Sequence, residues 1–282
     1  MRTFTNRALF NCSFVIAVAL LPSALLADFK ITPRPDLSID LPPELNEASG
    51  LYLDSEGIAY THNDETGIIF TIDLEKGITR PCHIIGVPTI AGDFEGLVGT
   101  DDSFFLVSSD GYLVEIEKGP CKTHKQYTIY DTGMRSVCEI EGIEHEASGG
   151  FLLLCKRAKQ KKKRSRILIY RWRRSTRFQS PEVFIDTKLG SPWKEFSNKH
   201  FSPSGLSSAA DGRLLGIDSA GRGIVTLAKD GEVEAVAQMP AQFHPQQEGL
   251  AVTADGDLFI VDEGGKGPGV LSVYRSAYKP SN

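Results

Sequence analysis

The stretch Gln246-Gln-Glu-Gly-Leu250 decides the fold, because four earlier stretches of the chain repeat its pattern. These are Glu47-Ala-Ser-Gly-Leu51, Asp93-Phe-Glu-Gly-Leu97, Glu139-Ile-Glu-Gly-Ile143 and Ser202-Pro-Ser-Gly-Leu206. Successive glycines of this signature are separated by 46, 46, 63 and 44 residues. Repeats of about 40–50 residues built from short strands are typical of β-propeller blades.

Each signature is followed by the same order of expected elements. In the last copy a turn at Asp255-Gly256 precedes an apolar strand over 258–261, and a third strand follows over 270–274. Gly and Asp suit such hairpin turns because they tolerate the required backbone angles. The apolar strand ends 13 residues after the signature glycine in all five copies, at Asn63, Ser109, Cys155, Asp218 and Asp262.

Five such units predict an all-β protein, a β-propeller with five blades, and six blades are the alternative count. Sheets of about four strands cannot bury both faces alone, so they pack face to face around an axis. A β-sandwich is the competing fold, and the fixed offset of 13 residues disfavours it. Residues 28–42 are expected to form an N-terminal arm or a closing strand, and residues 43–282 a single propeller domain.

Residues 1–27 have the layout of a secretory signal peptide. Arg2 and Arg7 precede an apolar run over 14–21, and small residues lead to an expected cleavage after Ala27. The run is too short to span a bilayer comfortably. We therefore expect a periplasmic or secreted protein, with attachment to the envelope as the alternative.

Four cysteines follow the signal segment, at positions 82, 121, 138 and 155. An exported protein can form disulfides, and four cysteines allow three pairings that the sequence does not distinguish. Buried free thiols are the alternative.

The charge of the chain is distributed unevenly. The segment Lys156–Arg177 holds twelve Lys or Arg and no acid, whereas the chain after residue 27 has 29 basic and 36 acidic residues in all. This segment is expected to be a projecting hairpin that is solvated or contacts an anionic envelope surface. Nucleic acid is not an expected partner of an exported chain that is otherwise acidic.

Candidate ligands for a metal ion lie in the signatures. Alternate residues of a strand share a face, so the positions one and three before each glycine turn toward one axis if that face lines the channel. Crowded carboxylates require protons, basic partners or a cation, and oxygen ligands favour Ca²⁺, with Mg²⁺ second. Capping of backbone N–H groups and a solvated rim are the alternatives. The expected metal ligands are Glu47, Asp93, Glu95, Glu139, Glu141, Glu248 and Asp262.

The candidate catalytic residues are His62, Asp64 and Glu95. His62 is a candidate proton shuttle at the end of a second strand, although a lone histidine is more often a hydrogen-bonding surface residue. The sequence contains no Gly-x-Ser-x-Gly elbow, P-loop, dinucleotide fingerprint or His-Glu-x-x-His motif.

Several pieces of the chain together resemble the SdiA-regulated, or phytase-like, family of bacterial β-propellers. The pieces are 45–51, Thr61-His-Asn-Asp64, 93–97, 141–143, and 247–251 with Val261-Asp-Glu-Gly264. The resemblance implies an envelope-located propeller with acidic residues near a channel that can hold calcium. Carried over by motif, its candidate residues are Glu47, His62, Asn63, Asp64, Glu95, Glu141, Glu248, Asp262 and Glu263.

The expected function is an exported, calcium-binding propeller that binds a small molecule or a protein at its channel face in the cell envelope. The alternative is a metal-dependent hydrolase of phosphoesters or other esters. In that alternative Glu95, Glu141 and Glu248 hold cations that activate water, and His62 or a neighbouring carboxylate acts as base. The sequence leaves open whether the protein is an enzyme.

Overall fold

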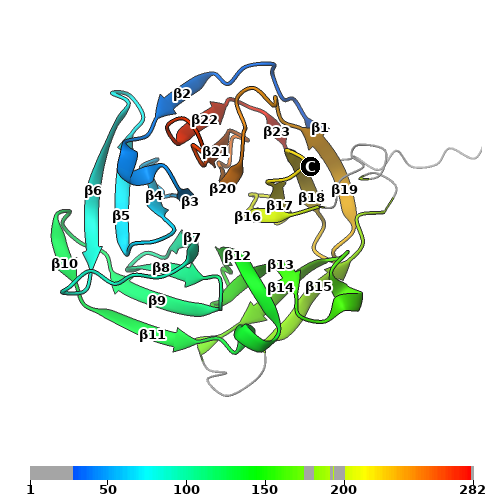
Figure 1. Ribbon diagram of the computed structural model, residues 1–282. Helices are drawn as coiled ribbons and strands as arrows, with labels where there is room; N and C mark the ends of the chain where they lie inside the picture. Colours follow the sequence, from blue (N-terminus) through cyan, green and yellow to red (C-terminus); the bar gives the residue numbers. More distant parts are fainter. Residues whose placement is uncertain (1–27, 175–180, 191–192, 194–200, 281–282) are drawn as a thin grey trace, which may run out of the picture.

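The computed structural model describes residues 28–174, 181–190, 193 and 201–280. Its strands form five blades around a central axis, so the five-blade propeller expected from the repeats is confirmed (Figure 1). The expected signal segment, residues 1–27, lies outside the described residues. Among the described residues no helix is long and apolar enough to cross a membrane.

Each blade is an antiparallel sheet whose first strand lies nearest the axis. Blade 1 contains β3 (Ala48–Leu53), β4 (Ala59–Asn63), β5 (Ile68–Asp73) and β6 (Ile78–Ile85). Blade 2 contains β7 (Phe94–Gly99), β8 (Ser103–Ser108), β9 (Tyr112–Glu117) and β11 (Tyr127–Asp131). Blade 3 contains β12 (Cys138–His145), β13 (Phe151–Ala158), β14 (Ile167–Trp172) and β15 (Glu182–Thr187). Blade 4 contains β16 (Pro203–Ser208), β17 (Leu214–Asp218), β18 (Gly223–Leu227) and β19 (Val233–Gln238).

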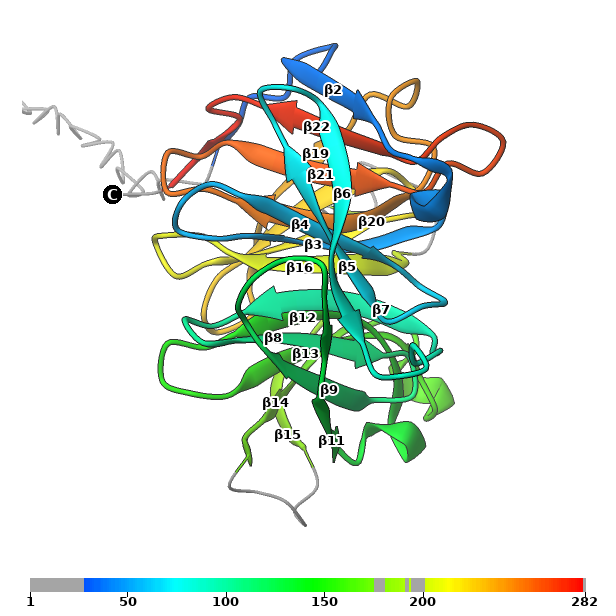
Figure 2. The ribbon, with the colours of Figure 1, turned by 90° about the vertical axis from the view of Figure 1, so that its left-hand side faces the viewer.

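Blade 5 joins the two ends of the chain. It contains β20 (Gln247–Val252), β21 (Leu258–Asp262), β22 (Val270–Tyr274) and, as its outer strand, β2 (Leu37–Asp40). Strand β2 pairs antiparallel with β22, so that buried Ile39 lies opposite Leu271 (Figure 2). Strand β1 (Asp28–Phe29) pairs likewise with β23 (Tyr278–Lys279). The N-terminal arm thus closes the ring.

Five apolar clusters hold the blades together, one between each pair of neighbouring blades. Between blades 5 and 1, for example, Phe259 and Val261 pack in one cluster with Leu51 and Phe70. Because every sheet is covered on both faces, its middle strands are apolar on both faces, as β8 illustrates. Burial of these faces is the main stabilising contribution to the ring.

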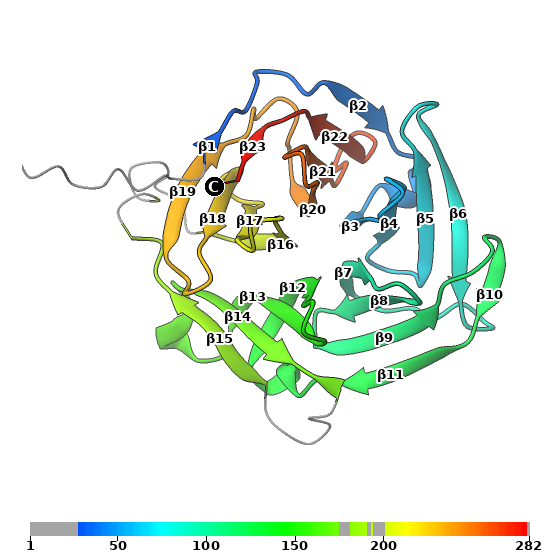
Figure 3. The same ribbon diagram turned by 180° about the vertical axis from the view of Figure 1, so that it is seen from behind.

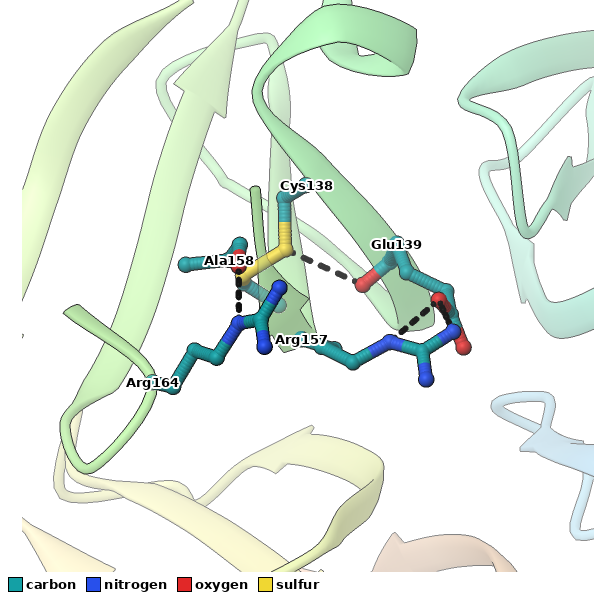
Figure 4. Close-up of a disulfide and its surroundings, with 6 residues drawn as sticks. Cys138, Glu139, Arg157, Ala158 and Arg164 are labelled. Carbon is teal, nitrogen blue, oxygen red and sulfur yellow. Dashed lines mark hydrogen bonds and ion pairs between the residues drawn. A yellow bond between two sulfur atoms is a disulfide. The ribbon is translucent and has the colours of Figure 1, made fainter. Parts of the chain in front are cut away.

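One segment crosses from blade 2 to blade 1 and back. Strand β10 (Thr123–Lys125) pairs in parallel with β6 of blade 1, and β11 directly after it pairs with β9 of blade 2 (Figure 3). A disulfide between Cys82 of β6 and Cys121 fixes this crossing. The other disulfide joins Cys138 and Cys155 across β12 and β13 (Figure 4). The sequence had left this pairing open among three possibilities and free thiols.

The described part of the basic segment, residues 156–174, includes the end of β13, the turn and β14, which is the hairpin expected between the second and third strands of blade 3. Six of its described cations pair with carboxylates: Lys156–Glu141, Arg157–Glu139, Lys163–Asp186, Arg166–Asp186, Arg171–Glu146 and Arg174–Glu115. Much of its charge is therefore balanced within the protein. Contact with an anionic surface stays a prediction.

Candidate functional site: an acidic cup at one mouth of the channel

The signature glycine of every blade lies at an irregularity of strand pairing. The register between the first two strands shifts there in all five blades. Such a bulge bends a strand and redirects side chains. The inner strands also meet too closely for a side chain: a Cβ on Gly249 would lie 2.8 Å from the carbonyl carbon of Gly50. The repeated glycine is thus required where the five inner strands converge.

The residues just before these glycines form an inner ring of three glutamates and two serines: Ser49, Glu95, Glu141, Ser204 and Glu248. Glu141 is 3% exposed and Glu248 is 8% exposed, so both carboxylates are withdrawn from bulk water. The Ser49 hydroxyl donates to Glu95 at 3.2 Å. This contact joins residues of two blades. It agrees with the expectation that Ser49 and Glu95 lie on the same face, toward the channel.

Lys156 supplies a positive charge inside this ring. Its Nζ atom lies 2.9 Å from Oε2 of Glu141, and Glu248 and Glu95 also interact with it electrostatically. Burial by itself lowers the pKa of Lys156, but these three carboxylates outweigh burial and the pKa is raised. Lys156 therefore stays an ammonium ion that faces three glutamates.

Burial and mutual repulsion raise the pKa of each glutamate of the inner ring. The value rises to about 8 for Glu95, where Glu141 and Asp93 add to burial, and to about 7 for Glu141, where Lys156 partly opposes it. For Glu248 burial is again the largest cause, and the pKa is about 8. Near neutral pH the ring thus holds protons as well as the lysine charge.

An outer ring of more exposed acids surrounds the inner one. Glu47 and Asp93 are exposed, and Asp64 and Glu263 are partly exposed. Burial and the charge of Glu47 raise the pKa of Asp64 to about 6, and the same two causes raise that of Glu263. These four acids belong to blades 5, 1 and 2. We call the inner and outer rings together the acidic cup.

On the side of blade 3 the cup is electrically balanced. Glu139 accepts a hydrogen bond from Arg157 Nε at 2.9 Å (Figure 4), and Glu141 pairs with Lys156. Blade 4 contributes only serines at the two corresponding signature positions. The excess negative charge therefore lies toward blades 5, 1 and 2.

Two predicted site residues, His62 and Asp262, lie inside the protein rather than at the cup. His62 is fully buried, its Nδ1 lies 2.9 Å from the carbonyl oxygen of Asn63, and burial lowers its pKa to about 4. Asp262 is also fully buried, and its Oδ2 lies 2.7 Å from Nδ1 of His244. Neither side chain is open to a ligand in the cup. The alternative of a surface histidine at position 62 does not hold, and the proton-shuttle role of His62 stays a prediction.

Asp262 and His244 belong to a buried hydrogen-bonded chain that ends at Tyr274. The second ring nitrogen of His244 lies 2.8 Å from the Tyr274 hydroxyl. Asp262 also accepts a hydrogen bond from the backbone N–H of Gln246 at 3.3 Å. Burial is the largest cause of its raised pKa. Asp262 thus caps the first strand of its own blade, which is one of the alternatives that the sequence left open.

Lys156 is the residue of the cup that sequence reasoning missed. The second strand of blade 3 was expected to end at Cys155, and Lys156 was assigned to the projecting hairpin. Strand β13 continues to Ala158, and Lys156 occupies the position 14 residues after the signature glycine. The same offset gives Asp64, Asp110, Ser219 and Glu263 in the other blades. Applying it to all five copies would have placed Lys156 at the cup.

The floor of the cup is apolar. The residue after each signature glycine is a buried aliphatic one: Leu51, Leu97, Ile143, Leu206 and Leu250. Together with the glycines and with Glu95 and Glu248 they line a void of about 10 Å³, which is at most the size needed for one water molecule. The two mouths of the channel are therefore separate sites.

The side chains of the cup differ from the ligand set of a calcium site. Calcium takes six to eight oxygen ligands, whereas one glutamate of the inner ring, Glu141, is already paired with the ammonium group of Lys156. Among the described residues, no three His, Cys, Asp or Glu side chains are close enough to share one metal ion. The side chains of the described residues therefore do not form a preformed calcium site.

Comparisons with known proteins identify the fold. No protein-family model and no curated protein matches the chain. Among solved structures, a luciferin-regenerating enzyme aligns over 87% of this chain and 97% of its own at 11% identity, with a TM-score of 0.56. The chain is a β-propeller.

Two further solved structures align over a similar share of the chain. A streptogramin B lyase aligns over 84% of this chain and 97% of its own, with 12% identity and a TM-score of 0.52. The PQQ-bound aldose sugar dehydrogenase of Streptomyces coelicolor aligns over 88% and 97%, with 13% identity and a TM-score of 0.51. At such low identity these likenesses establish the fold alone.

Proposed function

We propose that this propeller is an extracytoplasmic binding module whose acidic cup receives a cationic group of a small molecule or of a partner protein. The observation that carries the proposal is the convergence of Glu95, Glu141 and Glu248 on the ammonium group of Lys156. The ring already stabilises one ammonium ion there. An external cation would find similar carboxylates on blades 5, 1 and 2, where Lys156 does not neutralise them.

The arrangement of charge supports an approach from solvent. Exposed Glu47 and Asp93 attract a cation from a distance, and partly exposed Asp64 and Glu263 lie deeper. A cluster of carboxylates raises the local concentration of cations, and salt weakens this attraction. We expect the ligand to bind above Lys156, toward blades 5, 1 and 2.

Two observations support the location. The disulfides Cys82–Cys121 and Cys138–Cys155 indicate an oxidising, extracytoplasmic compartment. The resemblance of the signatures to SdiA-regulated, phytase-like propellers is consistent with a role in the cell envelope. Calcium binding, expected from the same resemblance, stays a prediction that metal analysis of the purified protein checks.

Hydrolysis of phosphoesters or other esters remains the alternative activity. Its candidate base His62 is buried behind Gly50, whose added Cβ would lie 2.6 Å from the imidazole Nε2. Asp64 and Glu95 are the remaining candidates for a base. We favour binding because the three inner glutamates have a resident ammonium partner rather than an assembled metal site.

Calorimetric titration of the chain from residue 28 onward with spermidine, at pH 8 and low salt, tests the proposal. We expect binding that weakens with added salt and is reduced at least tenfold in the variant Glu47→Gln/Glu263→Gln. Glu75→Gln, an exposed acid of the β5–β6 turn, is the matched control and should leave binding unchanged. An unchanged affinity for spermidine in the Glu47→Gln/Glu263→Gln variant, or no binding of spermidine to the wild-type protein, would contradict the proposal.

A further inference from the structure

The opposite mouth of the channel has a different chemistry. Beyond the aliphatic floor, the inner strands line a cavity of about 150 Å³. Nine of its thirteen described lining residues have aliphatic side chains, Leu53, Val98, Ile143, Leu206 and Val252 among them, and polar side chains and backbone groups complete the lining. We call this cavity the apolar well. Because the five aliphatic residues of the floor separate it from the acidic cup, it is an independent site.

Among the described residues, one carboxylate, that of Glu144, lies in the lining of the apolar well. Glu144 Oε1 accepts a hydrogen bond from the backbone N–H of His145 at 2.9 Å, and Oε2 accepts one from that of Ser208 at 2.9 Å. The two donors belong to strands of blades 3 and 4, so the carboxylate is fixed in position between blades. Each oxygen can accept a further hydrogen bond.

The surroundings of Glu144 favour a positively charged partner. Burial raises its pKa to about 7, although the two backbone donors oppose this. The other polar side chains of the lining are Tyr52, Ser207 and Ser208. No lysine or arginine lies in the described lining to neutralise the carboxylate. An ammonium group brought by a ligand would supply both the missing charge and hydrogen-bond donors.

We propose that the apolar well binds a small organic ammonium ion, with the ammonium group at Glu144 and the apolar body against the aliphatic side chains. The volume supports this size of ligand, since an engineered apolar cavity of about 150 Å³ in another protein binds benzene. A pocket with an apolar lining and a few fixed polar groups is the usual form of a small-molecule site. This site does not depend on the function proposed for the acidic cup.

Titration with benzylammonium ion at pH 7.5, followed by calorimetry and by NMR of the protein, tests this inference. Benzyl alcohol serves as the uncharged probe of similar shape. We expect millimolar or tighter binding of benzylammonium, and binding of benzyl alcohol at least tenfold weaker. Equal binding of the two probes, or no binding of benzylammonium at 10 mM (roughly the weak limit of specific binding), would overturn the proposal.

Variants separate the apolar well from the acidic cup. Glu144→Gln should weaken benzylammonium binding at least tenfold, and Ser208→Trp should abolish it by filling the well while keeping the backbone N–H. The cup variant Glu47→Gln/Glu263→Gln and the surface control Glu75→Gln should leave it unchanged. If Glu144→Gln unfolds, Ser208→Trp decides the question; retained binding in a folded Ser208→Trp variant would overturn the proposal.

Discussion

The ammonium group of Lys156 lies 2.9 Å from the carboxylate of Glu141, and both residues lie where the pairing of β12 and β13 is irregular. In that pair of strands Glu139 lies opposite Arg157, and Ile140 lies opposite Cys155. Lys156 thus falls between two paired positions. The irregular register thus brings an internal cation to the ring of acids where the inner strands converge.

Lys156→Met is expected to destabilise the protein most at high pH. Removing one partner of a fully buried ion pair costs about 3–5 kcal/mol, and the loss expected here is smaller because the Lys156 side chain is 32% exposed. Protons on the glutamates reduce this cost further as the pH falls. Urea unfolding at pH 8 and pH 5 measures the difference. Lys159→Met, at an exposed position of the same hairpin, is the control. Equal losses for the two variants at pH 8 would show that Lys156 is not the counter-ion of the ring.

The free energy of unfolding should fall as the pH rises from about 4.5 toward 8. In this window Glu95, Glu141 and Glu248 keep protons in the native state that the unfolded chain has lost, so rising pH favours unfolding. His62 acts in the opposite sense between about 4 and 6.5, because the unfolded chain binds its proton more readily.

Comparison with Glu95→Gln separates these two effects, since His62 is unchanged in that variant. Thermal unfolding at pH 5, 6.5 and 8 should give a flatter pH profile for Glu95→Gln than for the wild-type protein. Each unit of pKa difference corresponds to about 1.4 kcal/mol. Parallel profiles would mean that Glu95 titrates with an ordinary pKa.

Gly249→Ala should destabilise the ring by about 1–3 kcal/mol, the usual cost of overpacking a core. The added Cβ would meet backbone atoms at 2.8 Å (Gly50) and 2.9 Å (Leu51), which cannot move without displacing blade 1. Gly267→Ala is the matched control, because its nearest atom would be 3.9 Å away. Chemical unfolding of both variants measures the difference, and similar stabilities would argue against close approach of the inner strands.

Removal of the Cys138–Cys155 disulfide should weaken both the fold and the cup. The bridge spans 17 residues, for which a stabilisation of about 3 kcal/mol is typical, and its cysteines adjoin Glu139 and Lys156. We expect the double alanine variant to bind spermidine several-fold more weakly. The Cys82–Cys121 pair, at the blade 1–2 crossing, is the control: its removal should lower the melting temperature alone. Identical spermidine affinities for the two variants would contradict this assignment.

Much of the fold could be predicted because each blade repeats the same local pattern. The spacing of Gly50, Gly96, Gly142, Gly205 and Gly249 identified five blades, and strand alternation placed Glu95, Glu141 and Glu248 on a common face. The role of the N-terminal arm was left open, since pairing of β2 with β22 joins residues more than 200 positions apart in the sequence. Alternation within a strand carries no information on such a pairing.

The parts of the site that were missed depend on tertiary contacts. Lys156 was grouped with its basic neighbours because strand β13 was expected to end at Cys155, three residues before its observed end. The inward location of His62 follows from packing behind Gly50, and that of Asp262 from its bond to His244. The sequence did not indicate Glu144 as a site residue, because one of its hydrogen-bond partners, the backbone N–H of Ser208, belongs to another blade.

The central claim is that the acidic cup binds a cationic group. NMR spectra of protein with ¹³C-labelled Asp and Glu carboxyl groups, recorded during titration with spermidine at pH 8, test it most directly. The account predicts shifts concentrated at Glu47, Asp64, Asp93 and Glu263, with smaller ones at the inner glutamates. Shifts spread evenly over surface acids such as Glu75, or no shifts at all, would contradict it.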